Sequence, residues 1–210
     1  MASSAISAQG SLLAIGTGSG AARSITAIAN GNPTIITSAA HTLNNGDVIT
    51  IAGVGGATTV NGTFTVKNKT TNTFAIDLDT TGGAAFTTGG TATPVTFTQI
   101  ANIKTFSGFD GSASEIDVTN LASTAKEFRL GLTDPGQFTI EIDYDGTNAG
   151  HIALRSKQVS GVLSNFQLTL PNAAVIAFTG FVKKFSLAGG VDAVAKTSVD
   201  IRISGAITGL

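Results

Sequence analysis

Hydrophobic and polar residues alternate most regularly in the C-terminal half of the chain. Between residues 138 and 144 every second residue is Phe, Ile or Tyr, and Thr, Glu and Asp lie between them. Residues 199–204 alternate in the same way. A period of two predicts strands with one buried and one hydrated face. Residues 162–170 and 174–187 predict two further strands, separated by Pro171-Asn172.

One segment of this half predicts a short helix instead. Thr147 or Asn148 is suited to cap its N-terminus, the helix is expected to run through Gln158, and Ser160-Gly161 is suited to end it. Its expected apolar contacts are Ile152, Leu154 and Val159.

A different pattern covers residues 24–95. Short runs of Thr, Ile, Val and Phe recur there between Asn-Gly and Asn-Pro turns, which predicts a small all-β barrel or sandwich. The stretch contains only five charged residues, Asp47, Lys67, Lys69, Asp77 and Asp79. Residues 16–22 and 82–93 are rich in Gly and Thr. They are interpreted as the two segments that connect an inserted domain to the rest of the chain.

These patterns together predict a mainly β protein of two domains. Residues 1–23 and 96–210 are expected to form a β-sandwich or partial barrel with one short helix, to which residues 11–15 add a strand. Residues 24–95 are expected to form the inserted all-β domain.

The amino-acid composition indicates that other subunits cover part of the protein surface in an assembly. Only 12% of residues are charged, against about 25% in an ordinary soluble domain. Hydrophobic residues make up 42%, and the mean hydropathy is +0.30. A net charge of -1 and a pI near 6.0 argue against nucleic-acid binding through a basic patch.

Several other classes are disfavoured. The chain has no cysteine, so disulfides, thiol catalysis and cysteine-ligated metals are excluded. The first residues lack a basic region before an apolar run, and the charge-free residues 80–103, although long enough to span a bilayer, are rich in Thr, Gly and Asn. We therefore expect neither a signal peptide nor a membrane segment.

Candidate catalytic or metal-binding motifs have weak support. His41 and His151 lack partners in the pattern of a nucleophilic or metal site and are interpreted as structural or solvent-facing. Residues 16–20 read as a flexible linker better than as a phosphate loop, because no helix follows. Residues 141–146 resemble the start of a calcium loop, but the carboxylates fit the hydrated face of a strand better. Ser123-x-x-Lys126 lacks the companion motifs of a serine nucleophile.

With no Trp and one Tyr, an aromatic-rimmed acid cleft is not indicated either. The sequence thus predicts no enzyme, no cofactor and no metal.

Residues 96–210 resemble the tail tube (major tail) proteins of long, non-contractile-tailed phages. The resemblance is carried by Glu115-Ile116-Asp117-Val118-Thr119, Ala125-Lys126-Glu127-Phe128 and Gly131-Leu132-x-Asp134-x-Gly136. The order of later segments also fits, from Asp143-Tyr144-Asp145 through Phe178-Thr-Gly-Phe to Ser204-Gly205. Residues 40–74 are separately similar to a small β-module found in phage tail and adsorption proteins.

The resemblance implies a structural virion protein made in the host cytoplasm. Subunits of this family form hexameric rings that stack into a tube around a lumen. The implied partners are further copies, the tape-measure protein, and the tail terminator and distal tail proteins. DNA passes through the lumen without specific binding, and no membrane is involved.

We expect Glu141 and Asp143 to face the lumen; the alternative places their strand face outward or at a ring–ring contact. Residues 24–95 are expected to form an outward-facing decoration. A second interpretation is a baseplate or capsid-decoration protein that binds host-surface glycans through residues 24–95. An enzyme is the third.

Overall fold

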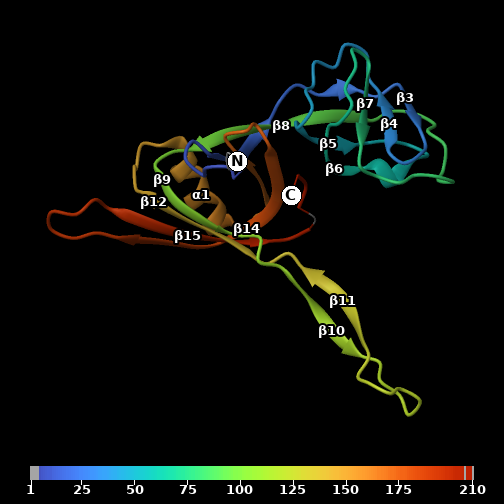
Figure 1. Ribbon diagram of the computed structural model, residues 1–210. Helices are drawn as coiled ribbons and strands as arrows, with labels where there is room; N and C mark the ends of the chain where they lie inside the picture. Colours follow the sequence, from blue (N-terminus) through green and yellow to red (C-terminus); the bar gives the residue numbers. More distant parts are fainter. Residues whose placement is uncertain (1–4, 206, 210) are drawn as a thin grey trace. The chain divides into compact units, whose positions relative to one another are not determined.

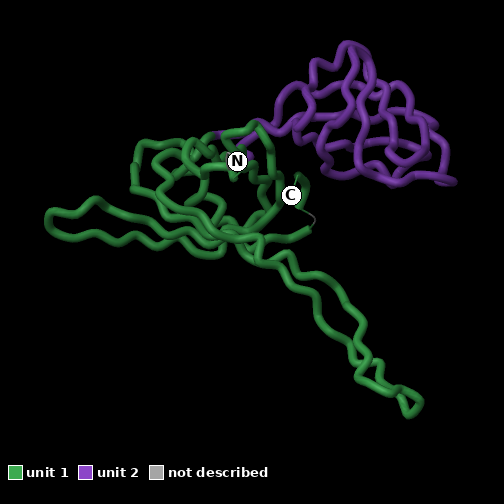
Figure 2. Tube along the Cα trace, viewed as in Figure 1, with its two compact units in different colours: residues 1–15, 99–210 green, residues 16–98 purple. Residues whose placement is uncertain are grey.

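The computed structural model describes residues 5–205 and 207–209, and strands dominate it. The predicted class, mainly β with one short helix, is confirmed. The chain divides into two compact units, shown in Figure 2. Unit 1 comprises Met1–Ile15 and Gln99–Leu210, and unit 2 comprises Gly16–Thr98. The predicted inserted domain, residues 24–95, lies within unit 2; that it faces outward stays a prediction.

Unit 1 is built on an antiparallel sheet in the order β1–β13–β14–β15–β12–β9. The strands are β1 (Leu12–Ser19), β13 (Ser164–Thr169), β14 (Val175–Ala188), β15 (Lys196–Ile203), β12 (Gln137–Asp143) and β9 (Ile103–Gly108). Figure 1 shows β14, β15, β12 and β9 around helix α1, and the pairing places them side by side in that order. The Gly-rich residues 16–19 continue strand β1, so their interpretation as a flexible linker was wrong.

The strict alternation in β12 and β15 produces the core of this unit. Phe138, Ile140 and Ile142 are buried on one face, and Val199, Ile201 and Ile203 of β15 are buried beside them. The ring of Phe178 lies 5.2 Å from that of Phe138 and 5.3 Å from that of Phe166. Burying such side chains contributes about 1.5–3 kcal/mol each, so the aromatic cluster anchors the sheet.

Helix α1 (Ala149–Ser160) begins after the predicted cap Asn148 and ends two residues beyond the predicted Gln158, before Gly161. The Asn148 side chain accepts a hydrogen bond from the His151 amide, and Gly161 ends the helix in the left-handed conformation. Gly150, His151 and Leu154 form its buried stripe. Ile152 and Val159 are 55% and 76% exposed because they lie off this stripe, so their predicted core contacts were wrong.

His151 joins the helix to two neighbouring loops. It is 1% exposed. Its Nδ1 accepts a hydrogen bond from the Asp145 amide at 3.1 Å, and Nε2 lies 2.9 Å from the Ala101 carbonyl oxygen. Nε2 therefore carries the proton and donates to that carbonyl.

A hairpin of β10 (Ser112–Asp117) and β11 (Phe128–Asp134) projects from the end of β9 and β12 (Figure 1). The Gly136 amide donates to Asp134 Oδ1 at 2.9 Å, and Arg202 forms an ion pair with Asp134. These contacts, the Gly136 amide first, hold the pKa of the Asp134 carboxyl below its ordinary value. Gly136 has φ +80°, and a Cβ there would meet the Asp110 carboxylate, so a tight glycine turn forms the root of the hairpin.

Unit 2 packs two sets of strands around a separate core. The strands β6–β5–β8, with β2 also paired to β8, are one end of a ten-stranded order that continues through β1, and β3–β4–β7 form a separate sheet. The strands are β2 (Arg23–Ser24), β3 (Ala27–Ala29), β4 (Thr34–Thr37), β5 (Val48–Ala52), β6 (Gly62–Thr65), β7 (Thr73–Ile76) and β8 (Thr91–Ile100), with a short 3-10 turn at Thr58–Val60. Its buried core includes Ile36, Ile49, Ile51, Val60, Phe74 and Ile76. The hydroxyls of Thr17 and Thr98 lie 2.7 Å apart, so the chain enters and leaves unit 2 at one place.

We predict that His151→Ala lowers the free energy of unfolding of unit 1 by about 2–4 kcal/mol, because it leaves a cavity and two unpaired backbone groups. Denaturant unfolding followed by circular dichroism measures this. Val159→Ala, on the exposed side of the same helix, is the control and should stay within about 0.5 kcal/mol. Equal stability of the two variants would contradict the role of His151.

We also predict that Gly136→Ala destabilises unit 1 by about 1–3 kcal/mol, because alanine is strained at positive φ and its Cβ meets Asp110. The same unfolding measurement tests it. The matched control is Gly146→Ala, where the nearest atom to an added Cβ, the Tyr144 hydroxyl, lies at 3.6 Å. If both substitutions leave stability unchanged, the turn at Gly136 does not constrain the hairpin root.

Candidate functional site: a two-faced sheet and an apolar hairpin

The face of the sheet opposite the core is polar on β15, β12 and β9, whereas β14 adds the exposed Phe181, opposite Arg202, to its polar residues. In β12, Thr139, Glu141 and Asp143 alternate with the buried residues. Cross-strand pairing places Asp200 beside Thr139 and Ser198 beside Glu141. The face is therefore lined by small hydroxyls and charged groups, and no large apolar side chain of β12 lies on it.

Glu141 and Asp143, predicted from the sequence to face a lumen, both lie on this polar face. Glu141 is exposed and its Oε2 accepts a hydrogen bond from the Thr105 hydroxyl at 3.3 Å. Asp143 is partly buried and its Oδ2 lies 2.9 Å from Lys104 Nζ. The structure thus brings the two carboxylates to one surface, two residues apart along one strand.

Cations share this face with the carboxylates. Lys184 of β14 lies opposite Asp200 in the strand register, and Lys196 of β15 lies opposite Asp143. Sequence reasoning missed Lys104 and Lys184, because irregularities in the register of β9 and β14 decide which face each one joins. The polar face therefore carries charges of both signs.

Two edges of this sheet are open in the described part of the chain. Strand β9 is the last strand in the order, and no described strand pairs with its outer edge. Strand β13 pairs with β14 only between Val175 and Gly180, so the second half of β14 has β15 on one side alone. Open strand edges present unpaired amides and carbonyls that favour pairing with another chain.

The β10–β11 hairpin exposes large apolar side chains. Phe128, Leu130 and Leu132 alternate along β11 and are 52%, 75% and 92% exposed. We call these three residues the hairpin stripe. A two-stranded hairpin is marginally stable alone, and a contiguous apolar stripe in water is typical of a contact surface.

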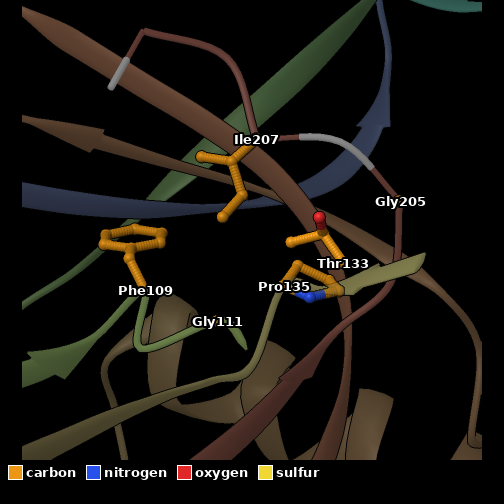
Figure 3. Close-up of a pocket in the computed structure, with 6 residues that line it drawn as sticks. All are labelled: Phe109, Gly111, Thr133, Pro135, Gly205 and Ile207. Atoms are coloured by element: carbon orange, nitrogen blue, oxygen red, sulfur yellow. The ribbon is translucent and has the colours of Figure 1, made fainter. Parts of the chain in front are cut away.

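At the root of the hairpin lies a cavity of about 470 Å³. Figure 3 shows Phe109, Pro135 and Ile207 around it, together with Thr133. Gly111 and Gly205 complete the lining and contribute only backbone. The cavity is thus mainly apolar, and none of these six residues is suited to acid–base or metal chemistry.

The other candidate groups have structural roles. His41 is 1% exposed; its Nδ1 accepts a hydrogen bond from the Leu43 amide at 3.0 Å, and its Nε2 lies 3.2 Å from the Thr73 carbonyl oxygen. Within residues 5–205 and 207–209, no group of three or more His, Asp or Glu side chains is placed to hold a metal ion. No helix of the same residues has both the length and the apolar character for crossing a bilayer.

Three comparisons with known proteins bear on this geometry. Residues 64–170 match the family model described as phage tail tube, lambda-like. This range begins inside unit 2 and ends after β13, whereas the resemblance noted in the sequence was placed at residues 96–210. Residues 29–96, all within unit 2, match the model of the ubiquitin-activating enzyme E1 FCCH domain.

One curated protein and two solved structures are similar to parts of the chain. "Structural protein 3" of Pseudomonas phage PAJU2 is 26% identical over 125 residues, which cover 49% of this chain and 76% of the phage protein. A chain of a native gene transfer agent virion superposes with a TM-score of 0.47 at 18% identity, covering 54% of this chain and 88% of that one. A chain from the tail of an empty gene transfer agent particle gives 0.45 at 20% identity, covering 63% and 92%.

The family model spans half of the chain, and its range contains the hairpin, its root and strand β12. The protein is therefore a structural virion component rather than an enzyme. It belongs to the lambda-like phage tail tube family.

Proposed function

We propose that six copies of this chain close into a ring and that rings stack into a tube whose lumen holds the tape-measure protein and conducts DNA during ejection. Family membership gives the tail tube role, and the resemblance supplies the number six. The tail terminator and distal tail proteins would bind the two ends of the tube.

The observation that carries this proposal is that strands β9 and β14 of the sheet each have an open edge. If β9 of one copy pairs with the second half of β14 of the next, both edges are satisfied and the sheets form a continuous wall. Such a contact joins two different surfaces, so it repeats around a ring until the ring closes.

The polar face then lines the lumen, with Glu141 and Asp143 on it. Its charges suit a conduit, because each lysine on the face has a carboxylate beside it or opposite in the register: Asp143 for Lys104 and Lys196, and Asp200 for Lys184. Unpaired cations would bind phosphates and release counterions, which would hold the DNA in place. A wall of balanced charge lets the DNA slide.

The natural absence of cysteine gives a direct test of the lumen face. We predict that Glu141→Cys, once in assembled tubes, reacts at least about tenfold more slowly with a polymer-linked maleimide than it does in unassembled subunits, because a bulky reagent enters a lumen only from its ends. Gel shift of the modified chain measures the rate.

Thr81→Cys, an exposed position of unit 2, is the matched control and should react at the same rate in both states. Equal rates for Glu141→Cys in tubes and subunits would place this face on the exterior. A cryo-EM map showing the Glu141 side chain outside the tube would have the same meaning.

We further propose that unit 2 is an outward-facing decoration. It encloses its own core, and its entry and exit strands are adjacent at Thr17 and Thr98, so it draws little support from the tube wall. A ring lumen also leaves no room for six such domains.

Deletion of residues 24–95 should therefore leave tube assembly intact. The deletion keeps Thr17 and Thr98 and joins them through a short Gly-containing loop. Negative-stain microscopy of the purified variant should show tubes of wild-type length with a smaller outer diameter. Subunits that form rings but no tubes would show instead that unit 2 braces adjacent rings.

A further inference from the structure

The turn at the end of the β10–β11 hairpin holds one leucine outward. Asn120 accepts a hydrogen bond from the Ala122 amide on its side chain at 2.9 Å and one from the Ser123 amide on its carbonyl at 3.0 Å. The Ser123 hydroxyl accepts one from the Asn120 amide at 3.1 Å. Between these bonded residues Leu121 is 108% exposed. The tip is thus ordered by polar contacts while its apolar side chain contacts nothing in its own chain.

The cavity at the hairpin root is an apolar counterpart of this tip. The Phe109 ring that forms one wall lies 5.0 Å from the ring of Phe138 and 5.4 Å from that of Phe178, so the aromatic cluster holds it in place. Pro135 and Ile207 form further walls. The volume of about 470 Å³ accommodates a leucine side chain together with part of its turn.

Tip and cavity cannot meet within one copy. The arm from Asp110 to Leu121, at roughly 3.3 Å per residue, is about 36 Å long. The distance from the hairpin root to the far end of the sheet is shorter, because the seven residues of β12, which end level with Ala188 of β14, span about 23 Å. An arm that lies along a second copy therefore reaches past that copy's sheet to the root of its hairpin.

The opposite end of the sheet supports this head-to-tail arrangement. The register places Asp143 and Ala188 at the end of the sheet away from the hairpin root, both opposite Lys196, so the β14–β15 turn projects from there. Its Leu187, Val191 and Val194 are 55%, 95% and 61% exposed. An arm laid along the next copy passes this turn first, so the hairpin stripe and the turn cover each other.

We propose that Leu121 of one copy fills the cavity of Phe109, Pro135 and Ile207 at the hairpin root of a second copy, in the adjacent ring. This inference rests on the proposed function, in which rings stack. The two surfaces differ, so the contact leaves a free tip at one end of a stack and a free cavity at the other, and rings add without limit.

Two single substitutions test the contact from each side. Leu121→Ser removes the apolar tip and Thr133→Trp fills the cavity. Each variant should retain the wild-type circular dichroism spectrum and form single rings. Each should give at least about tenfold fewer tubes than wild type by negative stain, because every ring pair loses several buried leucines.

A mixture of the two variants gives a sharper outcome. Thr133→Trp rings have intact tips and Leu121→Ser rings have intact cavities, so one of each should join into a pair that cannot grow. Double rings in the mixture, and single rings in each variant alone, are the expected result. Wild-type tube yield from Leu121→Ser would overturn the inference and leave the proposed function standing, whereas wild-type protein that forms neither rings nor tubes would overturn both.

Pairs of introduced cysteines identify the site at which Leu121 contacts the second copy. Tubes of Leu121→Cys/Thr133→Cys, after mild oxidation, should give multimers of more than two chains on a non-reducing gel, because each chain is bonded to one copy before it and one after it. Leu121→Cys alone is the control and should stay monomeric; dimers from it would show that tips meet tips. Multimers from Leu121→Cys/Val191→Cys instead would place the tip at the β14–β15 turn, and either result overturns the inference.

Discussion

The two-faced register of strands β12 and β15 is the constraint on which the rest of unit 1 depends. Phe138, Ile140 and Ile142 lie on the core side only because the pairing with β15 is held in one register. A slip by one residue would turn Glu141 and Asp143 into the aromatic cluster, where unpaired carboxylates are strongly unfavourable. The same register that buries the core therefore fixes which groups line the opposite surface, and it sets the direction in which the hairpin leaves the sheet.

Unit 2 has few charged side chains to keep its surface hydrated. Its threonines supply hydroxyl groups both on the surface and in the interior. Thr34 and Thr80 are buried and hydrogen-bonded to each other at 2.8 Å, and the Thr34 hydroxyl also donates to the Leu78 carbonyl. Threonine combines a β-branched shape suited to strands with a hydroxyl that satisfies backbone groups, so a β-domain rich in it needs few ions.

The sequence alone predicted the elements that depend on interactions between residues close together in the chain. Alternation located β12 and β15, and the capping chemistry of Asn148 and Gly161 located helix α1. The candidate carboxylates Glu141 and Asp143 were placed on the correct hydrated face for the same reason. Exposure of Ile152 could not be predicted, because apolar character does not say which stripe of a helix meets the sheet.

The features that the sequence did not predict depend on pairing between strands that are distant in the chain. The motif residues that carried the family resemblance gave no strand pattern of their own, yet they form the β10–β11 hairpin, whose stripe contacts no core. Lys104 joined the polar face through a register shift that no local pattern marks. Apolar residues that break a hydrated pattern without a partner in their own chain are typical of a surface shaped by other copies.

The hydrogen bond between the Thr17 and Thr98 side chains affects how easily evolution can replace the segment between them. Because the polypeptide departs and returns at neighbouring positions on adjacent strands, whatever lies between them has almost no loop-closure entropy to overcome and no strand order to preserve. The junction at Thr17 and Thr98 is therefore an insertion point. Unit 2 could be replaced there by another folded module or by a short peptide, or it could be removed. In the proposed tube, with unit 2 facing outward, every copy would carry the exchanged module, so one change in the gene would alter the whole outer surface.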